Sequence, residues 1–149
     1  MQERVGRDGD TVKLLRECDA GIKMGIESIN DVVNDVSDGD FKNLLANCKY
    51  EHEKLSAEVG VLLNEHSDEG KDPNPMAKGM SWIKTNAKMM ADPSDTTIAD
   101  LMTDGCNMGV KSLSRYINQY KNADKKSKDI AEKLVNIELG LTEDIRQYL

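Results

Sequence analysis

The stretch that decides the fold is residues 41–66, FKNLLANCKYEHEKLSAEVGVLLNEH. Its core-facing positions alternate between spacings of four and three, which places them on one face of an α-helix. These positions are Phe41, Leu45, Cys48, His52, Leu55, Val59, Leu62 and His66. His52 is a polar residue in the middle of an apolar stripe. It is therefore either a hydrogen-bonded core residue or part of a metal site.

A helix of the same kind precedes this stretch. Asp10 or Thr11 can cap its first turn. Its apolar residues, again spaced by three and four positions, continue to Val36. Residues 37–40, SDGD, predict a tight turn, with Gly39 in the left-handed conformation past the first helix and Asp40 as the cap of the second. Two helices joined so tightly lie antiparallel, and counting back from the turn places Gly25 level with His52.

A long connection follows His66. Gly70, Pro73 and Pro75 interrupt the helix, residues 76–91 predict a short helix, and Asp92-Pro93 ends it. Two further long helices are predicted, from Ser94 or Asp95 to about residue 121 and over residues 125–148. The expected fold is all-α, a ferritin-like antiparallel four-helix bundle with a long crossover that carries an additional short helix. Residues 10–149 form this single domain, and residues 1–9 are expected to be a flexible N-terminal arm.

The composition excludes several classes of partner. A net charge of −7 opposes binding to nucleic acid or to anionic membranes, and the few aromatic residues offer no platforms for stacking bases. No apolar run approaches the ~20 residues of a membrane span, and no secretory signal is apparent, so we expect a cytoplasmic protein. Cys18, Cys48 and Cys106 lie on apolar stripes, which indicates buried free thiols rather than disulfides.

Two segments carry a resemblance to a known group of proteins. Residues 79–90, GMSWIKTNAKMM, and residues 100–120, DLMTDGCNMGVKSLSRYINQY, are similar to parts of an uncharacterised bacterial four-helix-bundle family, a domain of unknown function in the ferritin-like superfamily. The resemblance covers residues 10–149. It implies the ferritin-like fold, and with it a possible di-iron site. Such a site takes a carboxylate from the first helix of each pair and Glu-x-x-His from the second.

The first helix pair departs from that ligand pattern. His52 stands where one histidine is required, but Lys49 occupies the position of the preceding glutamate. Gly25 replaces the carboxylate level with His52, and Glu27 lies two residues further on. Lys49 would also repel a dication, so this half of a di-iron site is degenerate.

The second pair departs as well. Glu138 could supply the glutamate of the motif, but Leu141 stands where its histidine should be. Cys106 lies near the position from which the third bundle helix should offer a carboxylate. We therefore predict a non-enzymatic binding or structural module without the usual di-iron site and without a cofactor. The alternative is an iron-binding or zinc-binding protein with a degenerate site at His52, Glu138, Cys106 and Glu27.

Methionines concentrate in the crossover. These flexible side chains either fill irregular gaps in the core or form an exposed surface that binds a partner. On the second interpretation, the predicted partner is a second copy of the chain, bound in a homodimer through Met76, Met80, Trp82 and Met90.

Overall fold

The protein is all-helical in the computed structural model, which describes residues 2–72 and 82–149, and side chains from residue 9 onward within those ranges. Four long helices are present: α1 (Gln2–Val32), α2 (Gly39–Glu65), α4 (Asp95–Gln119) and α5 (Lys125–Asp144). The short elements of the described residues are α3 (Ala87–Ala91) and two 3₁₀ turns, Val33–Asp35 and Arg146–Tyr148. No strand occurs in these ranges, so the predicted all-α class is confirmed.

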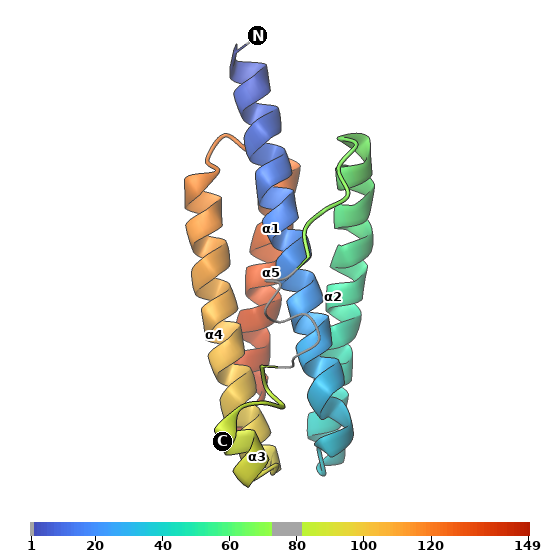
Figure 1. Ribbon diagram of the computed structural model, residues 1–149, viewed down its shortest axis with the longest axis vertical. Coiled ribbons are helices and arrows are strands. Elements are labelled where there is room, and N and C mark those ends of the chain that lie inside the picture. The colour runs from blue at the N-terminus through green and yellow to red at the C-terminus, as the bar shows by residue number, and fades with distance from the viewer. Residues whose placement is uncertain (1, 73–81) are drawn as a thin grey trace.

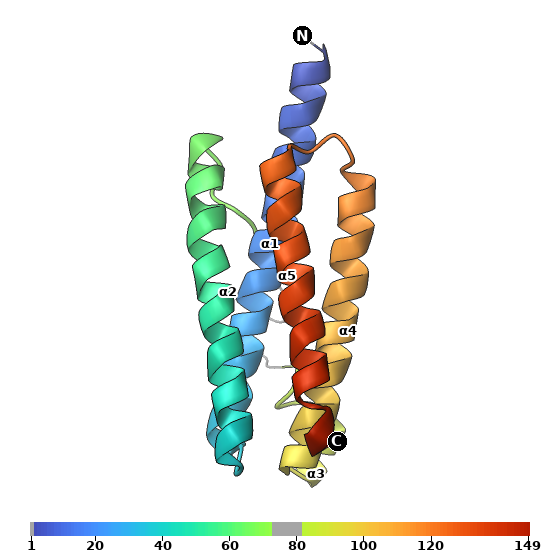
Figure 2. The same cartoon turned by 180° about the vertical axis from the view of Figure 1, so that it is seen from behind.

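The long helices pack side by side as a bundle (Figures 1 and 2). Helices α1 and α5 run in one direction, and α2 and α4 run in the other. Helix α1 contacts α2 and α4, α5 contacts the same two helices, and α1 and α5 also meet across the bundle. Helix α2 ends at one end of the bundle, and α3 lies at the other (Figure 1).

The turn between α1 and α2 differs in detail from the prediction. Asp38, not Asp40, caps α2, because its Oδ1 accepts a hydrogen bond from the backbone nitrogen of Phe41 at 2.9 Å. Gly39 is the first residue of α2 rather than a left-handed residue past α1. The short 3₁₀ turn after α1 already closes the first helix, so a glycine stop is not needed there.

The later helix starts agree with the prediction. The Ser94 side chain accepts from the backbone nitrogen of Thr97 and caps α4. Asp124 Oδ1 accepts from the backbone nitrogen of Ser127 at 2.8 Å and caps α5. Helix α5 ends at Asp144, four residues before the predicted end, and the 3₁₀ turn Arg146–Tyr148 follows it.

Helix α1 begins at Gln2, so the predicted start at Asp10 or Thr11 is wrong, and residues 2–9 belong to the helix. The two expected capping side chains bind the α4–α5 turn instead. Asp10 Oδ2 accepts from the backbone nitrogen of Asn122 at 3.0 Å, and Thr11 Oγ1 accepts from that of Asp124 at 2.9 Å. A tertiary contact thus uses the groups that local sequence assigns to a helix cap.

The crossover is less helical than predicted. Residues 76–81, with Met76 and Met80, lie outside the described ranges, and between residues 82 and 91 only α3 is an α-helix. Asn86 caps α3 by accepting from the backbone nitrogen of Lys88 at 2.9 Å. Trp82 Nε1 donates to Ser28 Oγ at 2.9 Å, and a Cβ added at Gly105 would lie 3.0 Å from the indole ring. Trp82 is therefore hydrogen-bonded to α1 and packed against α4.

The core consists of two apolar clusters along the bundle. One contains Ile29, Val32, Phe41, Leu45, Cys48, Ile98, Cys106 and Leu141 among others. The second contains Leu15, Cys18, Ile22, Leu55, Val59, Leu113, Ile130 and Leu134 among others. On α2, Cys48 belongs to the first cluster and Leu55 to the second, so His52 lies at the boundary between them. All three cysteines are buried and free.

Within residues 2–72 and 82–149, none of the helices combines the length and the apolar character needed to cross a membrane.

Candidate functional site

The centre of the bundle holds a buried pair of ionisable side chains, His52 of α2 and Glu138 of α5. His52 is 1% exposed, and its Nε2 lies 3.0 Å from Glu138 Oε1. Its Nδ1 lies 2.8 Å from the backbone oxygen of Cys48, one helical turn earlier. The Cys48 carbonyl can only accept, so Nδ1 donates to it. When the Glu138 carboxylate is ionised, Nε2 donates as well, and the ring is then an imidazolium.

The electrostatics agree with this geometry. Burial by itself lowers the pKa of His52, but the hydrogen bonds with Cys48 and Glu138 outweigh it and raise the pKa from 6.5 to about 10. At neutral pH the two side chains therefore form an ion pair between α2 and α5. A buried ion pair is tolerated only where its remaining polar atoms are also satisfied, and the Cys48 carbonyl satisfies the second ring nitrogen.

A glycine of α1 makes room for this pair. A Cβ added at Gly25 of α1 would lie 2.5 Å from His52 Nε2 and 2.8 Å from Cδ2, closer than real Cβ atoms come to other heavy atoms. Gly109 of α4 faces Glu138, where a Cβ would lie 3.6 Å from Oε2, an ordinary contact. The predicted alignment of Gly25 with His52 is confirmed, and the reason for the glycine is that the imidazole ring occupies the space of a side chain.

Two thiols border the pair. Cys48 Sγ lies 3.6 Å from His52 Nδ1. Burial, followed by the charge of Glu138 and a hydrogen bond with it, raises the pKa of the Cys106 thiol far above its usual range. Cys106 therefore stays protonated beside the Glu138 carboxylate. We call His52, Glu138, Cys48 and Cys106 the central polar layer.

The structure brings together three of the four residues of the predicted metal site. His52, Glu138 and Cys106 come from three different helices and meet in the central polar layer, whereas Glu27 is exposed on α1. Sequence reasoning missed Cys48, although its spacing of four residues from His52 on one helix was an available signal. Lys49 pairs with Glu53 on the outside of α2, at 3.8 Å, and is not part of the layer.

The layer is closed by its own hydrogen bonds. Among the residues that the structure describes, no three His, Cys, Asp or Glu side chains are arranged to hold a metal ion. An imidazolium has no lone pair to offer, so a metal could bind His52 only after the ring lost a proton and its bond to Glu138. The layer can hold charge and fix the register of α2 against α5, but as it stands it offers no open coordination position.

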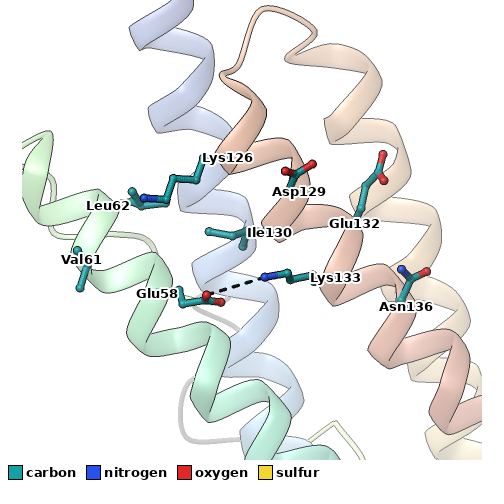
Figure 3. A pocket seen from close by; sticks show the side chains of 9 residues that line it. All are labelled: Glu58, Val61, Leu62, Lys126, Asp129, Ile130, Glu132, Lys133 and Asn136. Atoms are coloured by element: carbon teal, nitrogen blue, oxygen red, sulfur yellow. Dashed lines mark ion pairs between the residues drawn. The ribbon is translucent and has the colours of Figure 1, made fainter.

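A shallow groove of about 570 Å³ lies on the surface between α2 and α5 (Figure 3). Its lining mixes acidic, basic and apolar side chains: Glu58, Val61, Leu62, Lys126, Asp129, Ile130, Glu132, Lys133 and Asn136. Glu58 and Lys133 form an ion pair across it at 3.9 Å. No set of buried polar groups converges on the groove, so it lacks the features that orient a small substrate.

The central polar layer and the groove are two candidate sites in the described part of the chain. The layer is buried and internally satisfied, and the groove is open and of mixed charge. Neither presents an accessible nucleophile next to a base. Comparison of the chain with protein-family models, with curated proteins and with solved structures finds no match.

Proposed function

We propose that the protein is a non-enzymatic bundle of the ferritin-like type that works without a metal, as a binding or structural module. The observation that carries the proposal is the closed His52–Glu138 ion pair, with Nε2 and Oε1 3.0 Å apart. Ferritin-like proteins build their metal sites from side chains that project into the bundle core from facing helices, and here the two facing side chains bind each other and both histidine nitrogens are already used.

The order of the helices supports the ferritin-like part of the proposal. Two antiparallel pairs, α1–α2 and α4–α5, pack so that α1 meets α4 and α2 meets α5. The parallel helices α2 and α4 follow one another in the chain and need a long crossover, which is the connection that distinguishes ferritin-like bundles from simple up-and-down bundles.

Metal content is the decisive measurement. Protein purified after growth with added iron and zinc is expected to contain clearly less than one metal ion per chain. Its melting temperature is expected to stay unchanged on addition of Fe(II), Zn(II) or Mn(II), because a ligand that binds only the folded state would raise it. One or more tightly bound ions per chain, lost in His52→Ala, would overturn the proposal.

The alternative, a metal-binding bundle, is favoured by one observation. His52, Glu138 and Cys106 offer imidazole, carboxylate and thiol in one layer, and these are the ligand types that zinc accepts. The imidazole also donates a hydrogen bond from Nδ1 to the backbone carbonyl of Cys48, and metal-bound histidines commonly make such a bond with the nitrogen that does not bind the metal. In this case Cys106→Ser and His52→Ala should each release the ion, whereas Cys18→Ser in the second apolar cluster should retain it.

The homodimer through the Met-rich crossover stays a prediction, but its described residues are poorly placed for it. Met90 is 73% exposed, whereas Trp82 donates its indole N–H to Ser28 within the same chain. Met89 is buried. A dimer that used Trp82 as an anchor would have to break these internal contacts.

A further inference from the structure

The chain turns back sharply at the end of α2. Ser67 has a φ of 54°, in the left-handed region. Its backbone nitrogen donates to the oxygen of Asn64 at 3.0 Å, and that of Asp68 donates to the oxygen of Leu63 at 2.9 Å. These two bonds are a common way to end a helix. Residues 68–72, DEGKD, then lie along α1 (Figure 1). We call residues 68–72 the strap.

Charged groups hold the strap on α1. Lys71 contacts two carboxylates, because its Nζ lies 2.5 Å from Glu17 Oε1 and its backbone nitrogen donates to Asp19 Oδ2 at 2.8 Å. Lys23 Nζ lies 2.8 Å from Asp19 Oδ2 and 3.2 Å from Asp72 Oδ1. The hydrogen bond with Asp19 raises the pKa of Lys23, so its ammonium group stays charged at neutral pH. Lys23 therefore links the buried Asp19 carboxylate to the strap.

Apolar burial contributes little to this attachment. The strap contains no apolar side chain. Gly70 has a φ of 88°, which brings its backbone against Asp19, and a Cβ at this position would overlap the carboxylate. The remaining ion pair of the strap found in the described residues joins Asp68 Oδ1 and Arg16 Nε at 3.8 Å. The strap is thus held mainly by charge.

The other described end of the crossover is attached differently. Ile83 is fully buried and Met89 is 6% exposed, and both belong to the first apolar cluster. Trp82 packs against this cluster and donates to Ser28 Oγ at 2.9 Å. The crossover therefore begins with a segment held by charge and ends with one held by apolar burial.

These two kinds of attachment respond differently to salt. The range of electrostatic attraction falls from ~30 Å at 0.01 M salt to ~3 Å at 1 M, whereas apolar burial does not depend on charge screening. The side chains of Lys23, Lys71 and Asp72 are 37%, 43% and 56% exposed, so dissolved ions reach them. Segments with few apolar contacts are also the ones that open locally while the rest of a protein stays folded.

We propose that the strap is a salt-sensitive cover on α1, which is closed at low ionic strength and detaches at high ionic strength while the four long helices stay folded. Detachment uncovers the carboxylates of Glu17 and Asp19, which are largely buried when the strap is in place. The cover does not involve the central polar layer, so the inference goes beyond the proposed function and does not depend on it.

Amide hydrogen exchange on the full chain tests the proposal. Raising NaCl from about 20 to about 500 mM should speed the exchange of the Lys71 amide at least about fivefold, because several partly exposed ion pairs weaken together. Two amides serve as internal controls and should change less than about twofold. One is the Asn86 amide, which donates to the Ile83 oxygen at 3.1 Å. The other is the Leu55 amide in α2.

A pair of variants assigns the effect to the strap. Lys23→Met removes the ammonium group between Asp19 and the strap, so the Lys71 amide should exchange faster at low salt and respond less to added salt than in the wild type. Lys125→Met is the matched control. Lys125 also pairs with a carboxylate four residues away, that of Asp129 at 3.0 Å, but on α5. This variant should leave the exchange of the Lys71 amide as in the wild type.

Three results would overturn the proposal. The first is a Lys71 amide that exchanges equally fast at both salt concentrations. The second is an equal acceleration of the Asn86 and Leu55 amides, because the whole bundle and not the strap would then respond to salt. The third is a Lys125→Met variant that behaves like Lys23→Met, because the effect would then come from net charge alone. Circular dichroism at both salt concentrations checks that the helix content stays constant.

Discussion

Gly25 of α1 packs directly against the imidazole ring of His52 of α2, so closely that an added methyl group would lie 2.5 Å from Nε2. The contact joins two features that are unfavourable in isolation. A glycine in the middle of a helix costs about 1 kcal/mol relative to alanine, and a buried histidine must satisfy two nitrogens. Together they allow an ionised side chain to reach Glu138 through the centre of the bundle.

Gly25→Ala should destabilise the protein although alanine is the better helix former. The added methyl group must push the ring away from Glu138, and overpacking of this kind costs about 1 to 3 kcal/mol. Gly140→Ala on α5 is the control, because a Cβ there would meet no atom within 4 Å. It should leave stability unchanged or raise it by up to about 1 kcal/mol. Urea denaturation measures both, and equal effects of the two substitutions would contradict the packing argument.

Glu138→Gln should destabilise the bundle strongly. It leaves the buried His52 imidazolium without its counter-charge, and breaking one partner of a buried pair costs about 3 to 5 kcal/mol. The double variant His52→Leu with Glu138→Leu should be more stable than Glu138→Gln, because it removes both charges together. A double variant that is less stable than Glu138→Gln would show that the unpaired charge of His52 does not cause the destabilisation of Glu138→Gln.

The stability that His52 contributes should decrease at alkaline pH. Its pKa is raised from 6.5 to about 10 by hydrogen bonds that outweigh burial. A group whose pKa is higher in the folded state stabilises the protein fully below the unfolded value, and this stabilisation is lost as pH rises through the folded value. The difference in unfolding free energy between wild type and His52→Gln should therefore be largest near pH 6 and shrink between about pH 6.5 and 10. A difference that is constant over this range would contradict the ionised state of His52.

Asp19 should hold the chain segment after α2 onto α1. This carboxylate is 7% exposed, and its Oδ2 accepts from the backbone nitrogen of Lys71 and from Lys23 Nζ, both at 2.8 Å. Gly70 has a φ of 88° and lies against Asp19, where a Cβ would overlap Oδ2. Asp19→Ala removes charged hydrogen bonds from a buried site and should cost about 1.5 to 3 kcal/mol.

Hydrogen exchange provides the specific readout for this segment. The Lys71 amide should exchange faster in Asp19→Ala than in the wild type. Asp129→Ala is the control, since it removes an exposed pair with Lys125 on α5 and should change stability by less than about 1 kcal/mol. Unaltered exchange at Lys71 in Asp19→Ala would show that the segment is held by other contacts.

Much of the fold follows from local pattern. Apolar residues spaced by three and four positions specify long amphipathic helices, and every predicted core position from Phe41 to Leu62 is buried. Helices α4 and α5 begin where the sequence predicts, with Ser94 and Asp124 as their caps, because a cap is a contact within one turn. Even the meeting of Gly25 and His52 could be counted from the turn, since two helices joined by a tight turn stay in register over several turns.

Other features required the tertiary structure. Asp10 and Thr11 look like caps but bind the α4–α5 turn, and Trp82 looks like a free anchor but donates to Ser28, because each contacts a segment distant in the sequence. The same holds for the central polar layer. By itself, the sequence determined that a histidine would lie in the core level with a glycine. Only the packing of α5 against α2 decided that this histidine is an ion-paired imidazolium, because its partner Glu138 lies 86 residues away and no local pattern sets that distance.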